Sequence, residues 1–164
     1  QQSSVLIKPI ALTPAVQNTE VHSADGEMTL IMQTQKQNDG LATYSFFTSD
    51  ISGKNKKILF AKTVGAGVSM MIPKNSWSPD NKYVFLREDE SDSFDFFVFK
   101  ASGENFSDTE KYIDVMPLFA ESKIKYSMKD ITGWDSPTLL HAITSGPSYW
   151  FDVTTKAFFQ LASR

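Results

Sequence analysis

The sequence predicts an all-β fold of three propeller-like blades, each a four-stranded antiparallel sheet, and three observations support it. Helical periodicity is nearly absent along the 164 residues, because apolar and polar residues alternate or form short runs. Aromatic residues reach 13%, which suits the half-buried surface of pleated sheets. A turn motif recurs about every 55 residues, and a period of this length with about four strands per unit is typical of propeller blades.

The strand candidates form three groups, and each group reads as strand, loop, strand, turn, strand. They are 27–34, 42–50 and 56–62, then 82–88, 94–101 and 111–116, then 138–144, 148–154 and 157–162. We place the blades at about 16–63, 64–116 and 117–164, with the first strand of blade 1 at 16–21. A helical pattern is visible only at 114–130, where Pro117 suits the first position of a short helical turn.

The recurring turn lies between the first and second strands of each predicted blade. It reads "HSADGEMTLIM" from His22, "WSPDNKYVFLR" from Trp77 and, in a shorter form, "WDSPTLLHAIT" from Trp134. In the first two copies Asp caps the backbone, and the next residue, Gly26 or Asn81, tolerates the left-handed conformation. The equivalent positions of the two tryptophans predict a packing role between blades.

Residues 77–86 ("WSPDNKYVFL") and 23–31 ("SADGEMTLI") resemble the WD-like repeat of TolB-type and dipeptidyl-peptidase-type β-propellers. The resemblance covers about residues 16–164 as three repeats, and it implies that Trp77 and Asp80 belong to a structural signature. It specifies a fold unit and no activity, because such propellers serve as binding platforms, as gates to peptidase domains and as lyase or hydrolase scaffolds.

The leading functional hypothesis is a non-enzymatic propeller-type module that contacts a protein or a peptide. One alternative is an accessory propeller segment of a larger hydrolase or peptidase, and a second is a carbohydrate-binding module. No catalytic residue, cofactor or metal ligand is predicted. The acidic run Glu88, Asp89, Glu90, Asp92 and Asp95 is interpreted as a solvated hairpin loop, since its spacing does not fit an EF-hand.

Two weak candidate ligand sites remain. Gly65 and Gly67 lie in an expected connection between blades, at the face of a propeller where ligands often bind. Tyr149 and Trp150 form an aromatic pair that could stack on a sugar or a peptide. His22 and His141 lie in different repeats without zinc or nucleophile spacing, so both are interpreted as structural.

Three blades are fewer than the four to eight that close a propeller. We therefore expect either a fragment of a longer protein or a homodimer that completes six blades. Residues 1–15 are expected to form an extended lead-in, in which 3–12 adds an edge strand to a neighbour. Because the chain begins at Gln1, we also expect that an upstream segment has been removed, and we place the protein in the periplasm or at the cell surface.

Charge and composition exclude further classes of function. A net charge of -3 disfavours nucleic-acid binding, and the lysines of 52–60 are interpreted as polar tips of a hairpin. No apolar run is long enough to insert into a membrane, and the absence of Cys excludes disulfides.

The expected core residues are Met28, Leu30, Tyr44, Phe46, Val84, Leu86, Phe97, Phe99, Leu140, Phe151 and Phe159.

Overall fold

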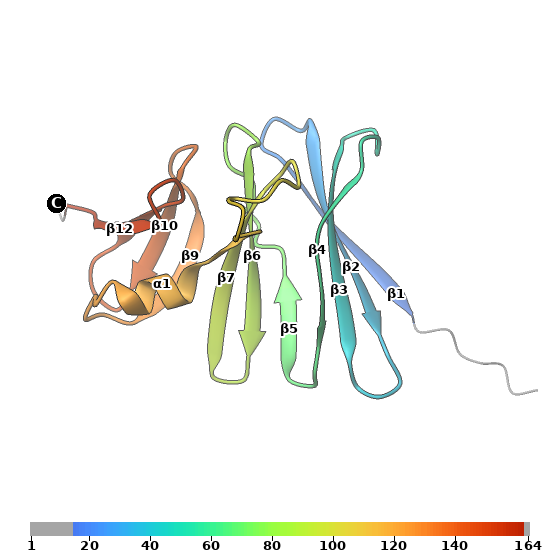
Figure 1. Cartoon of the computed structure of the whole chain (residues 1–164), viewed down its shortest axis with the longest axis horizontal. Coiled ribbons are helices and arrows are strands. Elements are labelled where there is room, and N and C mark those ends of the chain that lie inside the picture. The colour runs from blue at the N-terminus through green and yellow to red at the C-terminus, as the bar shows by residue number, and fades with distance from the viewer. Residues whose placement is uncertain (1–14, 163–164) are drawn as a thin grey trace, which may run out of the picture.

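The computed structural model describes residues 15–162 and confirms the all-β fold, with three four-stranded antiparallel sheets standing side by side (Figure 1). Each sheet follows chain order, so each is a meander. Blade 1 contains β1 (Val16–His22), β2 (Met28–Lys36), β3 (Ala42–Asp50) and β4 (Lys57–Val64). Blade 2 contains β5 (Val68–Met71), β6 (Tyr83–Glu90), β7 (Ser93–Lys100) and β8 (Ile113–Asp114). Blade 3 contains β9 (Met128–Trp134), β10 (Leu139–Thr144), β11 (Tyr149–Asp152) and β12 (Ala157–Gln160).

Blade 2 is apolar on both faces, and this property places it between the other two sheets. Side chains alternate along a strand, so Val84 and Leu86 point toward blade 1 while Phe85 points toward blade 3. Phe97 and Phe96 divide in the same way on β7. Two separate cores result, one between blades 1 and 2 and one between blades 2 and 3, and burial in both holds the three sheets together.

Nine of the eleven expected core residues are buried, and a tenth, Met28, is partly buried against the core between blades 1 and 2. Phe159 was predicted wrongly, because its side chain is 49% exposed. Phe159 pairs with Trp150 across the ladder and shares its outward face, whereas the neighbouring Phe158 packs into the core. A shift of one residue in a strand exchanges its two faces, and two adjacent phenylalanines hide that choice in the sequence.

The repeated turn has the same hydrogen bonds in blades 1 and 2. The Ser23 hydroxyl donates to the Asp25 carboxylate at 2.6 Å and accepts from the Met28 amide at 3.0 Å. Ser78 repeats both bonds with Asp80 at 2.8 Å and with the Tyr83 amide at 2.9 Å.

Left-handed backbone follows the capping Asp in both turns, as predicted. Gly26 has a φ of 75° and Asn81 a φ of 61°. The Asn81 side chain also donates to Asp25 at 2.8 Å, which ties the turn of blade 2 to the turn of blade 1.

The motif tryptophans join consecutive blades. The indole N–H of Trp77 donates to the carbonyl of Val21 in blade 1 at 3.0 Å. The indole N–H of Trp134 donates to the carbonyl of Ser76, which leads into the motif of blade 2, at 2.9 Å. In each case the acceptor is the residue just before the motif of the preceding blade. The predicted packing role is therefore combined with a directional hydrogen bond.

Three local predictions need correction. The helix α1 (Val115–Glu121) begins two residues before Pro117 and ends well short of 130. Proline is tolerated there because the first helical turn lacks internal acceptors for its amides, and the Met116 amide donates to Asp95 instead, at 3.1 Å. The strand β9 begins at Met128, inside the end of the pattern at 114–130 that was interpreted as helical, and continues beyond it. The strand expected at 111–116 is reduced to the two residues of β8.

The acidic run is also different from the predicted hairpin loop. β6 continues to Glu90 and β7 starts at Ser93, so of the five acidic residues only Asp92 lies in the turn. The other acidic residues lie in strands, where the pleat sends them to opposite faces of blade 2. The expected lead-in at 1–15, with its edge strand at 3–12, lies outside the described residues except for residue 15.

We predict that Trp77→Phe lowers the free energy of unfolding by about 1–2 kcal/mol, because it removes a buried hydrogen bond and part of a buried ring. Trp150→Phe is the matched control, since that indole donates to Asp135 near the surface. Urea unfolding followed by circular dichroism measures both variants. Equal losses in the two variants would contradict a special role for the bond between blades.

Candidate functional site

A cavity of about 490 Å³ lies between blades 1 and 2. The turns that form its walls are at the upper end of the sheets in Figure 1. We call this hollow the lysine cavity. Its walls come from the end of β3 with the following turn, from the motif turn of blade 2, and from the segment after β7. The lining residues are Met28, Thr48, Asp50, Asn55, Lys57, Asn81, Lys82, Tyr83, Lys100, Ala101, Ser102 and Glu104.

The lysine cavity has a fixed framework. The buried hydroxyl of Thr48 in blade 1 donates to the carbonyl of Ala101 in blade 2 at 2.8 Å. The motif turn that carries Lys82 is held by the Ser78 and Asp80 hydrogen bonds described above. Both walls are therefore tied to their sheets by bonds within and between the blades.

Three ammonium groups line the cavity, from Lys57, Lys82 and Lys100. No ion pair among residues 15–162 involves any of them. Asp50 is occupied by its own turn, where it accepts from the Ser52 hydroxyl at 2.6 Å and from the Lys54 amide at 2.8 Å. The hydrogen bond from Ser52, followed by those from Lys54 and Asn55, holds the pKa of Asp50 below its usual value. Glu104 also lines the cavity, so three ammonium groups share it with two carboxylates and its net charge is positive. This excess favours a ligand with a negative charge.

Sequence reasoning missed this site because its lysines come from three segments far apart in the chain. Lys57 belongs to the stretch 52–60, which was interpreted only as a polar hairpin. Lys82 belongs to the repeated turn, which was interpreted only as a structural signature. No short motif links the three residues, so only the packing of blade 1 on blade 2 brings them together.

The predicted glycine site lies at the opposite end of the same blade pair. Gly65 and Gly67 form the connection between β4 and β5, and they line a second hollow of about 440 Å³ with Gly40, Leu41 and Tyr44. This hollow carries little charge. Among the described residues that line it, Lys36 and Tyr44 are the only ones with ionisable side chains. The structure therefore does not bring the glycines together with Tyr149 and Trp150.

The predicted aromatic pair is divided between the two faces of β11. Tyr149 is buried in the core between blades 2 and 3, whereas Trp150 is half-buried on the outer face of blade 3. The Trp150 indole donates to Asp135 at 2.8 Å, and the same carboxylate oxygen lies 2.6 Å from Nδ1 of His141. Because the two rings point in opposite directions, they cannot act as one stacking platform.

The pair of His141 and Asp135 does not form a catalytic triad in the described structure. His141 has a hydrogen bond to Asp135, but none of its hydrogen bonds within residues 15–162 reaches a serine hydroxyl. Partial burial raises the pKa of Asp135, but the bonds from His141 and Trp150 outweigh this effect and leave the pKa below its usual value. The carboxylate is therefore charged at neutral pH and anchors the outer face of blade 3.

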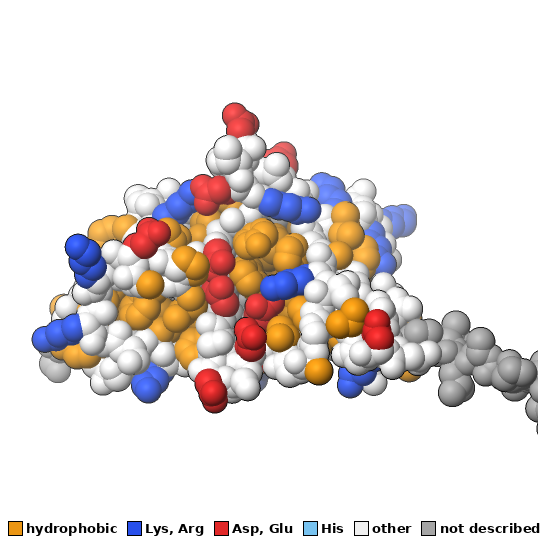
Figure 2. Space-filling model, turned by 60° about the horizontal axis from the view of Figure 1, so that its bottom comes forward, with side chains coloured by type: hydrophobic (Ala, Val, Ile, Leu, Met, Phe, Trp, Pro, Cys, Tyr) orange, Lys and Arg blue, Asp and Glu red, His pale blue; other side chains and the backbone are white. Residues whose placement is uncertain are grey.

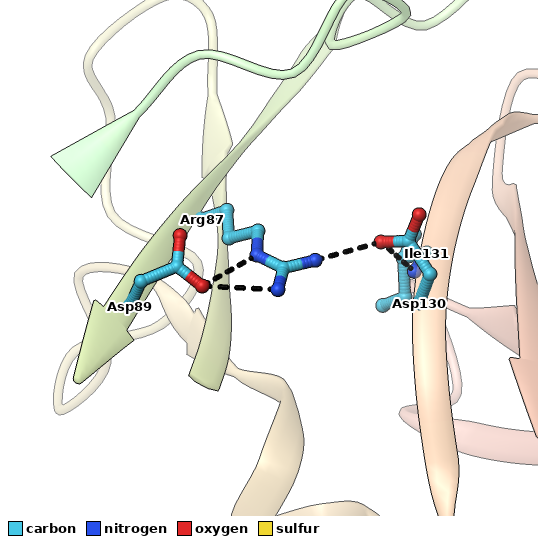
Figure 3. Close-up of polar contacts among 4 residues, drawn as sticks. All are labelled: Arg87, Asp89, Asp130 and Ile131. Atoms are coloured by element: carbon cyan, nitrogen blue, oxygen red, sulfur yellow. Dashed lines mark hydrogen bonds and ion pairs between the residues drawn. The ribbon is translucent and has the colours of Figure 1, made fainter. Parts of the chain in front are cut away.

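Acidic side chains gather at the other end of the sheets, on the face that Figure 2 brings forward. Between blades 1 and 2, Lys62 of β4 pairs with Glu88 of β6 at 2.5 Å. Between blades 2 and 3, Arg87 of β6 lies between Asp89 and Asp130, at 2.9 and 3.0 Å (Figure 3). At this end of the sheets, one cation thus crosses each gap between the blades. Elsewhere, Lys156 of blade 3 also pairs with Glu110 of the segment between β7 and β8.

Asp114 is the most perturbed carboxyl group of this acidic face. Burial is the largest cause, and repulsion from Asp95 and Glu88 adds to it, so that the pKa of Asp114 rises to about 7. One of its oxygens, Oδ1, is buried without a hydrogen-bond partner among the described residues. Within residues 15–162, no group of three or more His, Cys, Asp or Glu side chains is arranged to hold a metal ion.

Comparisons with known proteins add support for the fold. No family model matches the chain, and no curated protein matches it. Among solved structures, the chain is similar to a variant of the AtxE2 isopeptidase with Astexin3-dC4 bound, with a TM-score of 0.62 and 11% identity over 95% of this chain. A second similar structure is the WD40 domain of SCAP from fission yeast, with a TM-score of 0.42 and 12% identity over 92% of this chain.

The similarity to the isopeptidase structure describes architecture alone. This chain spans about a third of the length of each of the two solved chains, 32% and 35% respectively. At such low identity they say nothing of shared chemistry, and the narrower resemblance to TolB-type or dipeptidyl-peptidase-type propellers stays a prediction. No helix within residues 15–162 is long and apolar enough to cross a membrane.

The raised pKa of Asp114 predicts a stability that depends on pH. Between the unfolded value near 3.8 and the folded value of about 7, the folded state holds a proton that the unfolded state has lost. The free energy of unfolding therefore falls as pH rises through this window. Asp114→Asn removes that loss, so we expect the variant to be more stable than the original chain at pH 8, by on the order of 1 kcal/mol after solvent screening.

Thermal unfolding at several pH values between 4 and 8 measures this effect. The advantage of Asp114→Asn should shrink toward pH 4, where both proteins hold a neutral side chain at position 114. Asp89→Asn is the control, because Asp89 is paired with Arg87 and its replacement lowers stability at neutral pH. An advantage of Asp114→Asn that does not change with pH would contradict the titration of Asp114.

Proposed function

We propose that this chain is a non-enzymatic propeller-type module that binds a protein or a peptide, and that the lysine cavity receives an acidic part of that partner. The observation that carries the proposal is the set of three ammonium groups that line one cavity of about 490 Å³ and form no ion pair with any described residue. Such a volume is large enough for one or two side chains of a peptide.

The surroundings of the lysines support a peptide rather than a bare ion. Met28 and Ala101 add apolar surface to the cavity, and Tyr83 adds an aromatic ring with a hydroxyl group. Asn55 and Ser102 add polar groups that can exchange hydrogen bonds with a peptide backbone. Peptide sites commonly combine apolar contact with a few oriented polar groups, and here the charge selects acidic segments.

A second candidate function is an accessory propeller segment of a larger hydrolase or peptidase. The similarity to the isopeptidase structure favours it, because this chain aligns over 95% of its length with about a third of that protein. Sequencing of the gene that encodes this chain tests the idea. An adjoining α/β-hydrolase domain would support the second candidate, and a gene without a hydrolase domain would remove it.

We predict that a short peptide rich in Asp and Glu binds the chain, and that Lys82→Glu weakens its binding about tenfold because one ammonium group becomes a carboxylate. Lys57→Glu should act in the same direction. Lys129→Glu is the matched control, since it makes the same change of charge at an exposed position on β9 outside the cavity. Isothermal titration calorimetry with this peptide, and with its Asn and Gln counterpart, gives the affinities.

An equal loss in Lys129→Glu would show that net charge alone drives binding and would remove the cavity from the proposal. Strong binding of the Asn and Gln counterpart would contradict the selection of acidic segments. Mass spectrometry of the peptide after incubation tests the non-enzymatic part, and cleavage that depends on the chain would overturn it.

A further inference from the structure

Each blade has one face toward the preceding blade and one toward the following blade, and two of these faces have no neighbour in the described structure. Blade 2 uses both of its faces. Blade 1 presents an open preceding face and blade 3 presents an open following face. The two open faces are therefore of opposite kinds.

A row of side chains crosses each open face, and all of them except His141 are apolar. On blade 1 the ladder aligns Ile31 with Phe47 and Phe47 with Ile58. On blade 3 it aligns His141 with Trp150 and Trp150 with Phe159.

The outermost members of both rows are strongly exposed. Ile58 is 56% exposed and Phe159 is 49% exposed. In blade 2, Leu86 and Phe97 occupy the positions of Ile31 and Phe47, and there blade 1 covers them. The side chains of the open rows thus occupy positions that are buried in blade 2, but in the described structure no sheet covers them.

The hydrogen bonds between blades show how a further blade fits onto each open face. Trp77 and Trp134 each donate to the carbonyl just before the motif of the preceding blade, which is that of Val21 and then of Ser76. The next acceptor in this series is the carbonyl of Gly133 in blade 3. The donor position of blade 1 is His22, and it lies on the open face of that blade.

The ring of His22 suits that role. Its Nδ1 lies 3.0 Å from the Thr29 hydroxyl of the same blade, so the other ring nitrogen, Nε2, is the one available for a neighbour. Blade 1 therefore carries the donor side of the repeated contact and blade 3 carries the acceptor side. Each open face fits the other kind and does not fit itself.

Charged side chains border both rows. On blade 1, the ammonium group of Lys56 lies 4.4 Å from the centre of the Phe47 ring and so borders the apolar row. On blade 3, Asp135 holds His141 and Trp150 of the other row. Glu20 pairs with Ile31 and also lies on the open face of blade 1, so that face carries a cation and a carboxylate. Lys56 of one copy can therefore face Asp135 of another.

We propose that a second copy of this chain covers both open faces, so that blade 1 of each copy packs on blade 3 of the other and six blades form a closed ring. Six lies within the four to eight blades of closed propellers. Two identical contacts of this head-to-tail kind close under two-fold symmetry, and they remove both open apolar faces at once. The proposal does not depend on the lysine cavity, which lies between blades 1 and 2 of one copy.

Sedimentation equilibrium and light scattering of the full 164-residue chain test the ring. The expected mass is twice the monomer mass of 18.4 kDa. Ile58→Lys and Phe159→Asp each place a charge in the proposed contact, and each should raise the dimer dissociation constant at least about tenfold. Ile51→Lys is the matched control, because Ile51 is also 56% exposed but lies in the turn after β3, and it should leave the mass unchanged.

Mixing the two variants tests the polarity of the contact. Ile58→Lys keeps an intact blade 3 and Phe159→Asp keeps an intact blade 1, so an equimolar mixture regains one original contact and should form mixed dimers. Persistence of the Ile58→Lys dimer together with loss of the Phe159→Asp dimer would indicate contact between two blade 3 faces and overturn the head-to-tail ring.

Folding of each variant is verified by circular dichroism, and Ile143→Lys on the same face replaces Phe159→Asp if that variant unfolds. A monomer at all protein concentrations would overturn the ring outright.

The test of the ring is separate from the test of the peptide site, since Lys82→Glu should change the affinity for the peptide without changing the mass of the assembly. Loss of peptide binding in a chain that stays dimeric would concern the cavity alone.

Discussion

The whole structure depends on one constraint, which is that a blade with two apolar faces must be covered on both sides. Blade 2 shows this most clearly, because Phe85 and Phe96 face one neighbour while Leu86 and Phe97 face the other. A lone sheet with this pattern would expose both sets of side chains to water. The stacking of sheets follows from that pattern, and the same requirement is the reason why we propose further contacts at the ends of the stack.

Polar interactions determine the position of one sheet along the next, which apolar burial alone does not determine. Apolar contact has little directional preference, so it does not by itself set how far one sheet slides along the next. The indole bonds of Trp77 and Trp134 join fixed points of successive blades at one end. At the other end Lys62 and Arg87 cross the two gaps to carboxylates. Together these contacts define the register between sheets, and they bring the three lysines of the cavity to a common place.

The candidate sites lie where this arrangement leaves charge or apolar surface without a counterpart. The lysine cavity lies between the ends of two blades, and its ammonium groups form no ion pairs in the described structure. At the acidic face of the other end, burial first and then the neighbouring Asp95 and Glu88 raise the pKa of Asp114. On the outer faces of blades 1 and 3, side chains occupy positions whose equivalents in blade 2 are buried. Each feature is a consequence of stacking, because each combines residues of different blades or the missing neighbour of one blade.

The sequence alone determined the class of fold, the three repeats and the chemistry of the turns. Alternating residues define strands locally, and Asp25–Gly26 and Asp80–Asn81 specify their turns through short-range hydrogen bonds and φ preferences, which need no distant partner. Tertiary structure decided that Phe158 and not Phe159 enters the core, that Tyr149 and Trp150 point apart, and that β9 is a strand. It also decided that Lys57, Lys82 and Lys100 share one cavity. The physical reason is that these outcomes depend on how sheets pack against one another, and such contacts between distant segments leave no local pattern in the chain.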